Sequence, residues 1–192
     1  LLRRLTALEE ARQQEYNRLG VADAEVHDSI QRHLEYLAAE LAQLRGRIQD
    51  HIDQHPGLKH KQDLLQSIPG IGAVVSQNLL SWLSRIDAFD SARQLAAFAG
   101  LTPKRHESGS SVRGRTRLSK IGHADLRKLL YFPAMSAIRH NPLLKAFAER
   151  LRQNGKPPKL ILAAAMRKLL HIAFGVLRSN APFNPNILAK NI

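Results

Sequence analysis

The sequence predicts an all-α protein in which an N-terminal coiled-coil or helical-hairpin arm is followed by a compact helical domain. Apolar residues recur at helical spacing, glycines and prolines separate the helical runs, and no segment has a convincing strand pattern. Within the compact domain we expect a helix-hairpin-helix and a long basic serine loop. The expected bounds are residues 1–55 for the arm, 56–178 for the helical domain and 179–192 for a loosely ordered tail.

The N-terminal arm carries an apolar repeat of about 3.5 residues, which is typical of a coiled coil or a long helical hairpin. The repeat is formed by Ile30, Leu34, Leu37, Leu41, Leu44, Ile48 and Ile52. An earlier helix ends at Gly20, and residues 20–23 can turn the chain back as an antiparallel hairpin. Two interpretations stay open: a helix packed on its own domain, and a protruding coiled coil that makes the protein a homo-oligomer.

The segment Ile68-Pro-Gly-Ile-Gly72 separates two apolar helical runs and predicts a helix-hairpin-helix. Gly70 and Gly72 permit positive φ and a close backbone approach. The first amides of the second helix then face outward, where they can bind a phosphate oxygen. A plain corner between two helices is the alternative.

Capping residues predict where the later helices begin and end. A helix over residues 91–99 is capped by Asp90 or Ser91 and stops at Gly100, and Asn141 with Pro142 opens another. The longest apolar stretch, residues 160–177, contains Arg167, Lys168 and His171, so it predicts a core helix rather than a membrane span. We expect no membrane partner.

Residues 102–117 contain almost nothing apolar, and loops of this length tend to be functional or disordered. Ser108, Ser110 and Ser111 are candidate nucleophiles, because nearby arginines can neutralise a phosphodiester and His106 can accept a proton. A loop that only grips DNA is the alternative. Beside the two glycines, the residues expected to bind DNA are Lys104, Arg105, His106, Gly109, Ser110, Ser111, Arg113, Arg115, Arg117, Lys120, Arg127 and Lys128.

Charge separates the two regions. Residues 1–55 carry 7 Lys and Arg against 10 Asp and Glu, whereas the remainder carries 22 against 6. The overall net charge of +13 indicates a polyanionic partner, usually nucleic acid, although ribosomal-type and membrane-surface proteins share this signature. The absence of cysteine excludes disulfides and thiolate chemistry, and the few acidic residues of the basic region argue against a self-contained two-metal nuclease. We predict no metal site.

Several separate motifs occur in one order. They are Ser67-Ile-Pro-Gly-Ile-Gly72, Phe98-Ala-Gly-Leu-Thr-Pro103, Glu107-Ser-Gly-Ser-Ser-Val-Arg-Gly-Arg115, Leu118-Ser-Lys-Ile-Gly-His123 and Leu126-Arg-Lys-Leu-Leu130. This set resembles the C-terminal transposase domain of the DEDD insertion-sequence transposases, a family that includes the Piv-type DNA invertases and the bridge-RNA-guided recombinases. The resemblance covers about residues 65–178, and residues 1–55 resemble the coiled-coil segment that precedes this domain.

The resemblance implies a DNA transposase or site-specific recombinase in which Ser108 attacks the scissile phosphate and becomes covalently linked to DNA. It also implies a RuvC-like domain whose Asp/Glu/Asp/Asp carboxylates hold Mg²⁺. Nothing in this chain resembles that domain, so we expect no cofactor here and little activity from the chain alone. The chain begins with Leu1, which is compatible with a fragment or a degenerate element.

Expected partners are DNA, a guide RNA where the element uses one, and further copies in a dimer or tetramer. We expect a bacterial cytoplasmic protein that is nucleoid-associated when bound to DNA. The rival interpretations are a non-enzymatic helix-hairpin-helix DNA-binding module and a basic RNA-binding scaffold.

Overall fold

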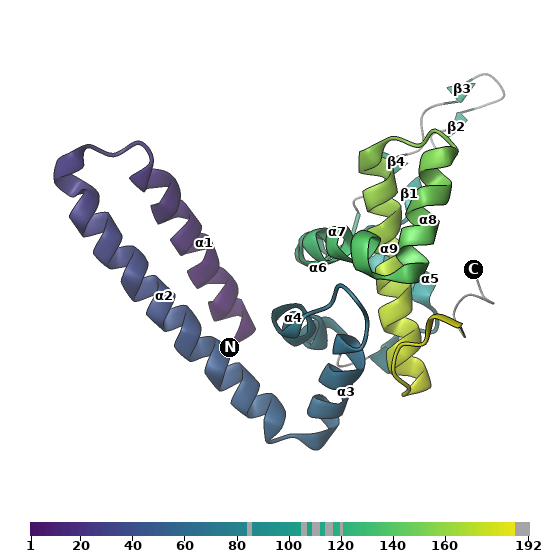
Figure 1. Cartoon of the computed structure of the whole chain (residues 1–192), viewed down its shortest axis with the longest axis horizontal. Coiled ribbons are helices and arrows are strands. Elements are labelled where there is room, and N and C mark those ends of the chain that lie inside the picture. Colours follow the sequence, from purple (N-terminus) through teal and green to yellow (C-terminus); the bar gives the residue numbers. More distant parts are fainter. Residues whose placement is uncertain (84–85, 105–106, 109–111, 114–116, 120, 187–192) are drawn as a thin grey trace. The chain divides into compact units, whose positions relative to one another are not determined.

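The computed structural model describes residues 1–83, 86–104, 107–108, 112–113, 117–119 and 121–186 (Figure 1). The chain divides into two compact units, Leu1–Lys59 and His60–Ile192. We call them the hairpin unit and the helical unit. The all-α class predicted from the sequence is confirmed.

The hairpin unit consists of α1 (Leu2–Leu19) and α2 (Ala24–Asp53), which run antiparallel and pack along their length (Figure 1). Much of the predicted apolar repeat forms the buried face of α2, namely Leu37, Leu41, Leu44, Ile48 and Ile52. An ion pair between Arg45 and Glu9, 2.8 Å apart, joins the two helices. The apolar repeat is therefore used within one chain.

The helical unit is organised around one long helix. Its elements are the end of α3 (Pro56–Gln66), α4 (Ala73–Leu83), the 3₁₀ turn η1 (Ile86–Ala88), α5 (Ala92–Phe98), α6 (Ala124–Leu129), α7 (Tyr131–His140), α8 (Pro142–Gln153) and α9 (Pro158–Ser179). Helix α9 packs against α5, α7 and α8 and contributes ten buried residues. It is long and apolar enough to cross a membrane, but 56% of its most apolar window is buried inside the protein, as in a core helix.

Local capping explains where two of these helices begin. The Ser91 hydroxyl accepts a hydrogen bond from the Gln94 amide at 3.3 Å, which caps α5. Asn141 is fully buried, and its side-chain oxygen accepts from the amides of Leu143 and Leu144. With Pro142 as the first residue, this arrangement starts α8 as the sequence predicts.

The expectation of a chain without strands is corrected at one place. The described residues include four two-residue strands: β1 (Pro103–Lys104), β2 (Glu107–Ser108), β3 (Val112–Arg113) and β4 (Arg117–Leu118). They form two separate antiparallel pairs, β1 with β4 and β2 with β3. The sequence gives no signal for these pairs because strand prediction depends on alternating apolar residues, and this segment is almost entirely polar.

The first part of the tail contacts the helical unit. Asn180 adopts a left-handed conformation with φ of 51° and ends α9. Its side chain lies 2.9 Å from His60 Nε2, and the Phe183 amide donates to the Ser67 hydroxyl at 2.8 Å. These bonds hold the described tail residues against the unit.

Candidate nucleic-acid interface

Within the segment predicted to be a serine loop, the described residues form two antiparallel strand pairs, and we call the strands β1 to β4 together the serine arm. At its base Pro103 pairs with Leu118 and Lys104 with Arg117, and farther out Glu107 pairs with Arg113 and Ser108 with Val112. Figure 1 shows β2 and β3 farther from the helices than β1 and β4. The backbone of Ser108 therefore lies in the outer part of the arm.

The register of the serine arm places cationic residues opposite each other. Lys104 and Arg117 are direct cross-strand partners. The backbone register therefore brings two cationic positions together at the base of the arm.

Two of the sequence motifs meet where the arm joins the helices. The Ser119 amide donates to the Thr102 carbonyl and the His123 amide to the Phe98 carbonyl, both at 2.8 Å. Gly122 has a φ of +138°, and a Cβ there would lie 2.4 Å from the Phe98 carbonyl oxygen. Only glycine fits this contact, so the Gly122 motif anchors the arm to the end of α5.

Aromatic rings fill the space beneath this anchor. The rings of Phe98 and His123 are 4.2 Å apart between centroids, and Trp82 lies 5.1 Å from His123. Phe89 packs edge-on against Phe98 at 5.3 Å. The base of the arm therefore adjoins a cluster of packed aromatic rings that includes Trp82 of α4 and Phe98 of α5.

The two glycines of the predicted helix-hairpin-helix have different surroundings. Gly70 has a φ of +105°, and a Cβ there would lie 2.7 Å from Ala137 Cβ of α7. Gly70 is thus required for packing between the α3–α4 corner and α7. Gly72 has no heavy atom within 4 Å of such a Cβ, and it is exposed with Ala73 and Val74 at the start of α4. The phosphate-binding interpretation therefore concerns Gly72 and the first amides of α4.

Apart from Arg127, the other predicted DNA-binding residues fall into three groups. Lys104, Arg113 and Arg117 belong to strands of the serine arm. Lys128 is exposed on α6, 3.9 Å from Asp125. Arg105, His106, Gly109, Ser110, Ser111, Arg115 and Lys120 lie outside the described residues.

Arg127 has a role inside the domain. Its guanidinium donates to the Ala99 carbonyl at 3.1 Å, and Ala99 is the last residue of the α5 cap. A cation at this end of a helix neutralises carbonyls that lack intrahelical partners. This geometry favours a structural contribution from Arg127 over direct DNA contact.

A concave surface of about 1100 Å³ was not foreseen from the sequence. We call it the basic groove. Its cationic lining is Arg93 of α5 with Lys159, Arg167 and Lys168 of α9, and the imidazole of His171 lies among them. Its apolar lining includes Leu101, Phe147, Leu160, Ala163 and Ala164. Pro103 and Leu118, a cross-strand pair at the base of the serine arm, also line it. The sequence feature that could have indicated this groove is the interruption of the apolar stretch by Arg167, Lys168 and His171.

The cations of the basic groove influence one another. Burial, together with the charges of Arg167, Lys168 and Arg93, lowers the pKa of His171 to about 4, with burial the largest cause. Burial, followed by the charge of Arg150, also lowers the pKa of Lys168. His171 is therefore neutral at pH 7, and its Nε2 lies 3.5 Å from Arg167 Nε.

The described residues do not fit a magnesium site. No group of three or more His, Cys, Asp or Glu side chains comes together among them in a way that could hold a metal ion. A two-metal centre for phosphoryl transfer needs several carboxylates at one place. We therefore assign no reaction step to a metal held by this part of the chain.

Comparison with known proteins identifies the class of the domain. Residues 62–149 match the family model described as "Transposase IS116/IS110/IS902 family". This match assigns a transposase domain to the helical unit. The chain belongs to the insertion-sequence transposase family.

Three relatives illustrate the extent of the similarity. The pilin gene-inverting protein of Moraxella bovis is 38% identical over 148 residues, which cover 77% of this chain and 46% of that protein. The IS1111A transposase of Coxiella burnetii is 36% identical over 98 residues, covering 47% and 27% respectively. An IS110 protein of Streptomyces coelicolor is 27% identical over 135 residues, covering 70% and 32%. The chain thus spans less than half the length of these relatives.

Proposed function

We propose that this chain is the DNA-binding, nucleophile-bearing portion of a DNA transposase or site-specific recombinase. The observation that carries the proposal is the serine arm: the Ser108 position lies in its outer part, while Lys104 and Arg117 occupy opposite positions at its base. Membership of the insertion-sequence transposase family supports it. So does similarity to proteins whose name describes inversion of a pilin gene.

The proposed step is a transfer of a DNA phosphoryl group to serine. The Ser108 hydroxyl oxygen attacks the scissile phosphorus, an O–P bond forms, and the bond from phosphorus to one deoxyribose oxygen breaks. The hydroxyl proton passes to a base, and the departing deoxyribose oxygen receives a proton, so the DNA end is left joined to serine. Cations of the arm offset the charge that develops on the transferring group.

The remaining chemistry is assigned to residues outside this chain. We propose that a RuvC-like domain with an Asp/Glu/Asp/Asp set supplies Mg²⁺, which stabilises charge on the reacting oxygens when it is bound. The chain alone is then expected to bind DNA and to cleave it little. The protein would act on DNA in the bacterial cytoplasm, together with a guide RNA where the element encodes one.

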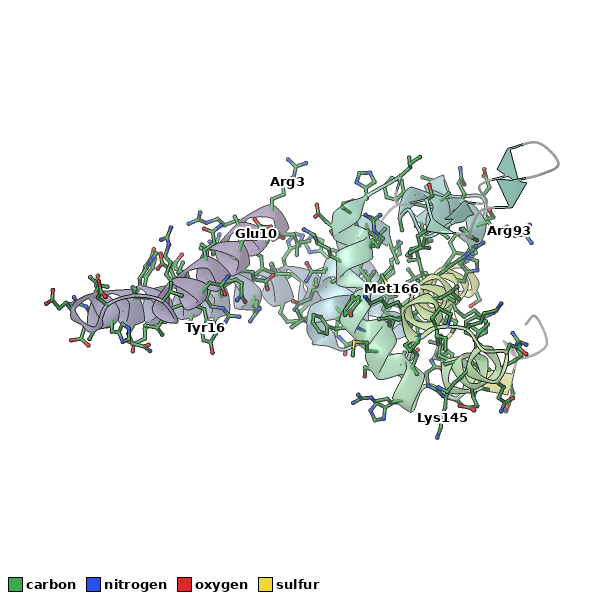
Figure 2. The ribbon with its side chains drawn as sticks, turned by 90° about the horizontal axis from the view of Figure 1, so that it is seen from above. Arg3, Glu10, Tyr16, Arg93, Lys145 and Met166 are labelled. Atoms are coloured by element: carbon green, nitrogen blue, oxygen red, sulfur yellow. The ribbon has the colours of Figure 1, made fainter. Side chains whose placement is uncertain are left out.

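Self-association through the hairpin unit is a further part of the proposal. Leu37 and Leu44 are buried between α1 and α2, so they are occupied within one chain. Tyr16 on α1 and Tyr36 on α2 remain 66% and 58% exposed, and Figure 2 shows Tyr16 projecting from the hairpin. We expect light scattering to find a dimer or larger species that Tyr16→Glu with Tyr36→Glu dissociates. A monomer at tens of micromolar in the unmodified chain would contradict this.

The nucleophile is tested in a protein that carries this chain together with a RuvC-like DEDD domain. Such a protein should form a denaturation-resistant adduct with element DNA, and mass spectrometry should place the DNA on Ser108. Ser108→Ala should abolish the adduct and strand exchange while leaving DNA affinity nearly unchanged. Ser110→Ala and Ser111→Ala are the matched controls and should retain both activities.

Two outcomes would overturn the assignment. An adduct that persists in Ser108→Ala, or that maps to Ser110 or Ser111, would show that another hydroxyl is the nucleophile. Failure of every variant and of the unmodified protein to form an adduct, with DNA binding intact, would favour the non-enzymatic helix-hairpin-helix module.

A further inference from the structure

The basic groove concentrates positive charge without acidic compensation. Arg93, Lys159, Arg167 and Lys168 line it, and no carboxylate belongs to its lining among the described residues. None of these four cationic side chains forms an ion pair with another described residue. Cations gathered in a concave surface focus an attractive field on an anion.

The floor of the basic groove is apolar. It is formed by Leu160, Ala163 and Ala164 of α9 together with Phe147 of α8. Leu160 is 40% exposed, and Arg150 lies 5.5 Å above the Phe147 ring. An occupant must therefore present an anionic group on one side and a flat or apolar group on the other.

We propose that the basic groove binds an unpaired nucleotide of a nucleic-acid strand, with its phosphate on the cationic side chains and its base against the apolar floor. A volume of about 1100 Å³ gives room for a nucleotide, since ligand pockets commonly measure about 300–1000 Å³. In a duplex the base faces are covered by stacking and pairing. An unpaired base exposes the face that apolar and aromatic side chains bind.

The position of the groove connects it with the serine arm. Pro103 and Leu118 line the groove and pair with each other at the base of the arm. A strand held in the groove would therefore continue beside the arm that carries Ser108. Binding in the groove would separate a nucleotide from its complement near the reacting phosphate. This inference rests on the proposed function, which identifies the polyanion as a nucleic acid.

The test uses the whole chain and a fluorescently labelled oligothymidylate of about eight nucleotides, a typical length for a single-strand site. The variant Arg93→Gln with Lys159→Gln removes two exposed cations of the groove. The control Arg139→Gln with Lys145→Gln removes two exposed cations from α7 and α8, and Figure 2 shows Lys145 well apart from Arg93. Circular dichroism should find both variants folded.

The groove variant should bind the oligothymidylate at least about tenfold more weakly than the unmodified chain, because two charge-assisted contacts are lost. Its slope of log K against log[salt] should become less negative by about 1.4. The control should keep its slope and lose less than about threefold in affinity. Equal losses in the two variants would overturn the assignment to the groove.

Two further probes test whether the groove binds an unpaired nucleotide. An abasic oligomer of equal length should bind at least about fivefold more weakly, because base contacts are removed. A matching duplex should bind more weakly than the single strand, and the groove substitutions should affect it no more than the control. Equal binding of the abasic oligomer, or a duplex preferred and equally sensitive to the groove substitutions, would overturn the proposal.

Oligouridylate of equal length distinguishes the source of the strand. Tighter binding of thymidylate identifies DNA, tighter binding of uridylate identifies RNA, and equal binding supports recognition of the shared base and phosphate. The adduct on Ser108 is measured separately. If the adduct forms but the groove substitutions have no specific effect, the groove proposal is wrong and the proposed function stands. If the groove binds the oligomer as predicted but no adduct forms, the groove proposal stands and the proposed function is wrong.

Discussion

Replacement of Gly70 by alanine tests whether the α3–α4 corner depends on its close packing against α7. The added Cβ would lie 2.7 Å from Ala137 Cβ and 2.9 Å from both Ala137 Cα and N. Ordinary carbon contacts are about 3.5–4.0 Å, so α7 or the corner must shift. Overpacking costs about 1–3 kcal/mol, and holding an L-residue at a φ of +105° costs about 1–2 kcal/mol. We expect a total destabilisation of about 2–5 kcal/mol.

Urea unfolding monitored by tryptophan fluorescence measures this loss. Trp82 is the single tryptophan and lies in the helical unit, so its signal reports on the part that contains Gly70. With a urea m-value of about 2 kcal/mol/M, the midpoint should fall by about 1–2.5 M. Gly72→Ala is the matched control, because its Cβ meets nothing within 4 Å, and it should stay within about 0.5 kcal/mol. A stable Gly70→Ala variant, or equal destabilisation by Gly72→Ala, would refute the reasoning.

Three further predictions concern charge, the hairpin unit and the serine arm. The pKa of His171 is about 4 in the folded chain and about 6.5 when unfolded, so the unfolded state binds the proton first. Its contribution to stability should be complete above pH 6.5 and decline as the pH falls toward 4, and an imidazole NMR titration near 6.5 would contradict this. Leu41 is 1% exposed, so Leu41→Asp should lower the free energy of unfolding of the hairpin unit by several kcal/mol. Thermal unfolding followed by circular dichroism measures this loss, and Ala42→Asp at the exposed neighbouring position should not cause it. Arg113→Ala with Arg117→Ala should make the salt slope of duplex DNA binding less negative by about 1.8 and weaken all sequences alike; an unchanged slope would show that these side chains do not contact phosphates.

The helices could be predicted because their signals are local. Asn141 and Pro142 start α8 through contacts within four residues, and the apolar face of α2 follows directly from the spacing of its leucines. The motifs around Ser108 and Gly122 likewise identified the serine arm as the segment of interest. Its strand pairs could not be predicted, because polar residues paired only through backbone hydrogen bonds carry no apolar alternation.

The role of individual residues within those motifs was decided by packing. Gly70 and Gly72 look equivalent in the sequence, yet only Gly70 lies against α7. Arg127 looks like other cations of the basic segment, but its guanidinium is bound to the Ala99 carbonyl. The sequence shows which side chains are present, but the residues that contact them come from distant segments of the chain.

The sequence by itself determined the all-α class, the division of charge and the family to which the chain belongs, because helical periodicity, composition and motif order are properties of the linear chain. Only the tertiary structure decided that Arg93 of α5 and Lys159 of α9 face one groove above an apolar floor. These residues share no periodicity or motif, and the packing of α5 on α9 brings them together. Their proximity arises from long-range burial of apolar surface, which no short sequence window contains.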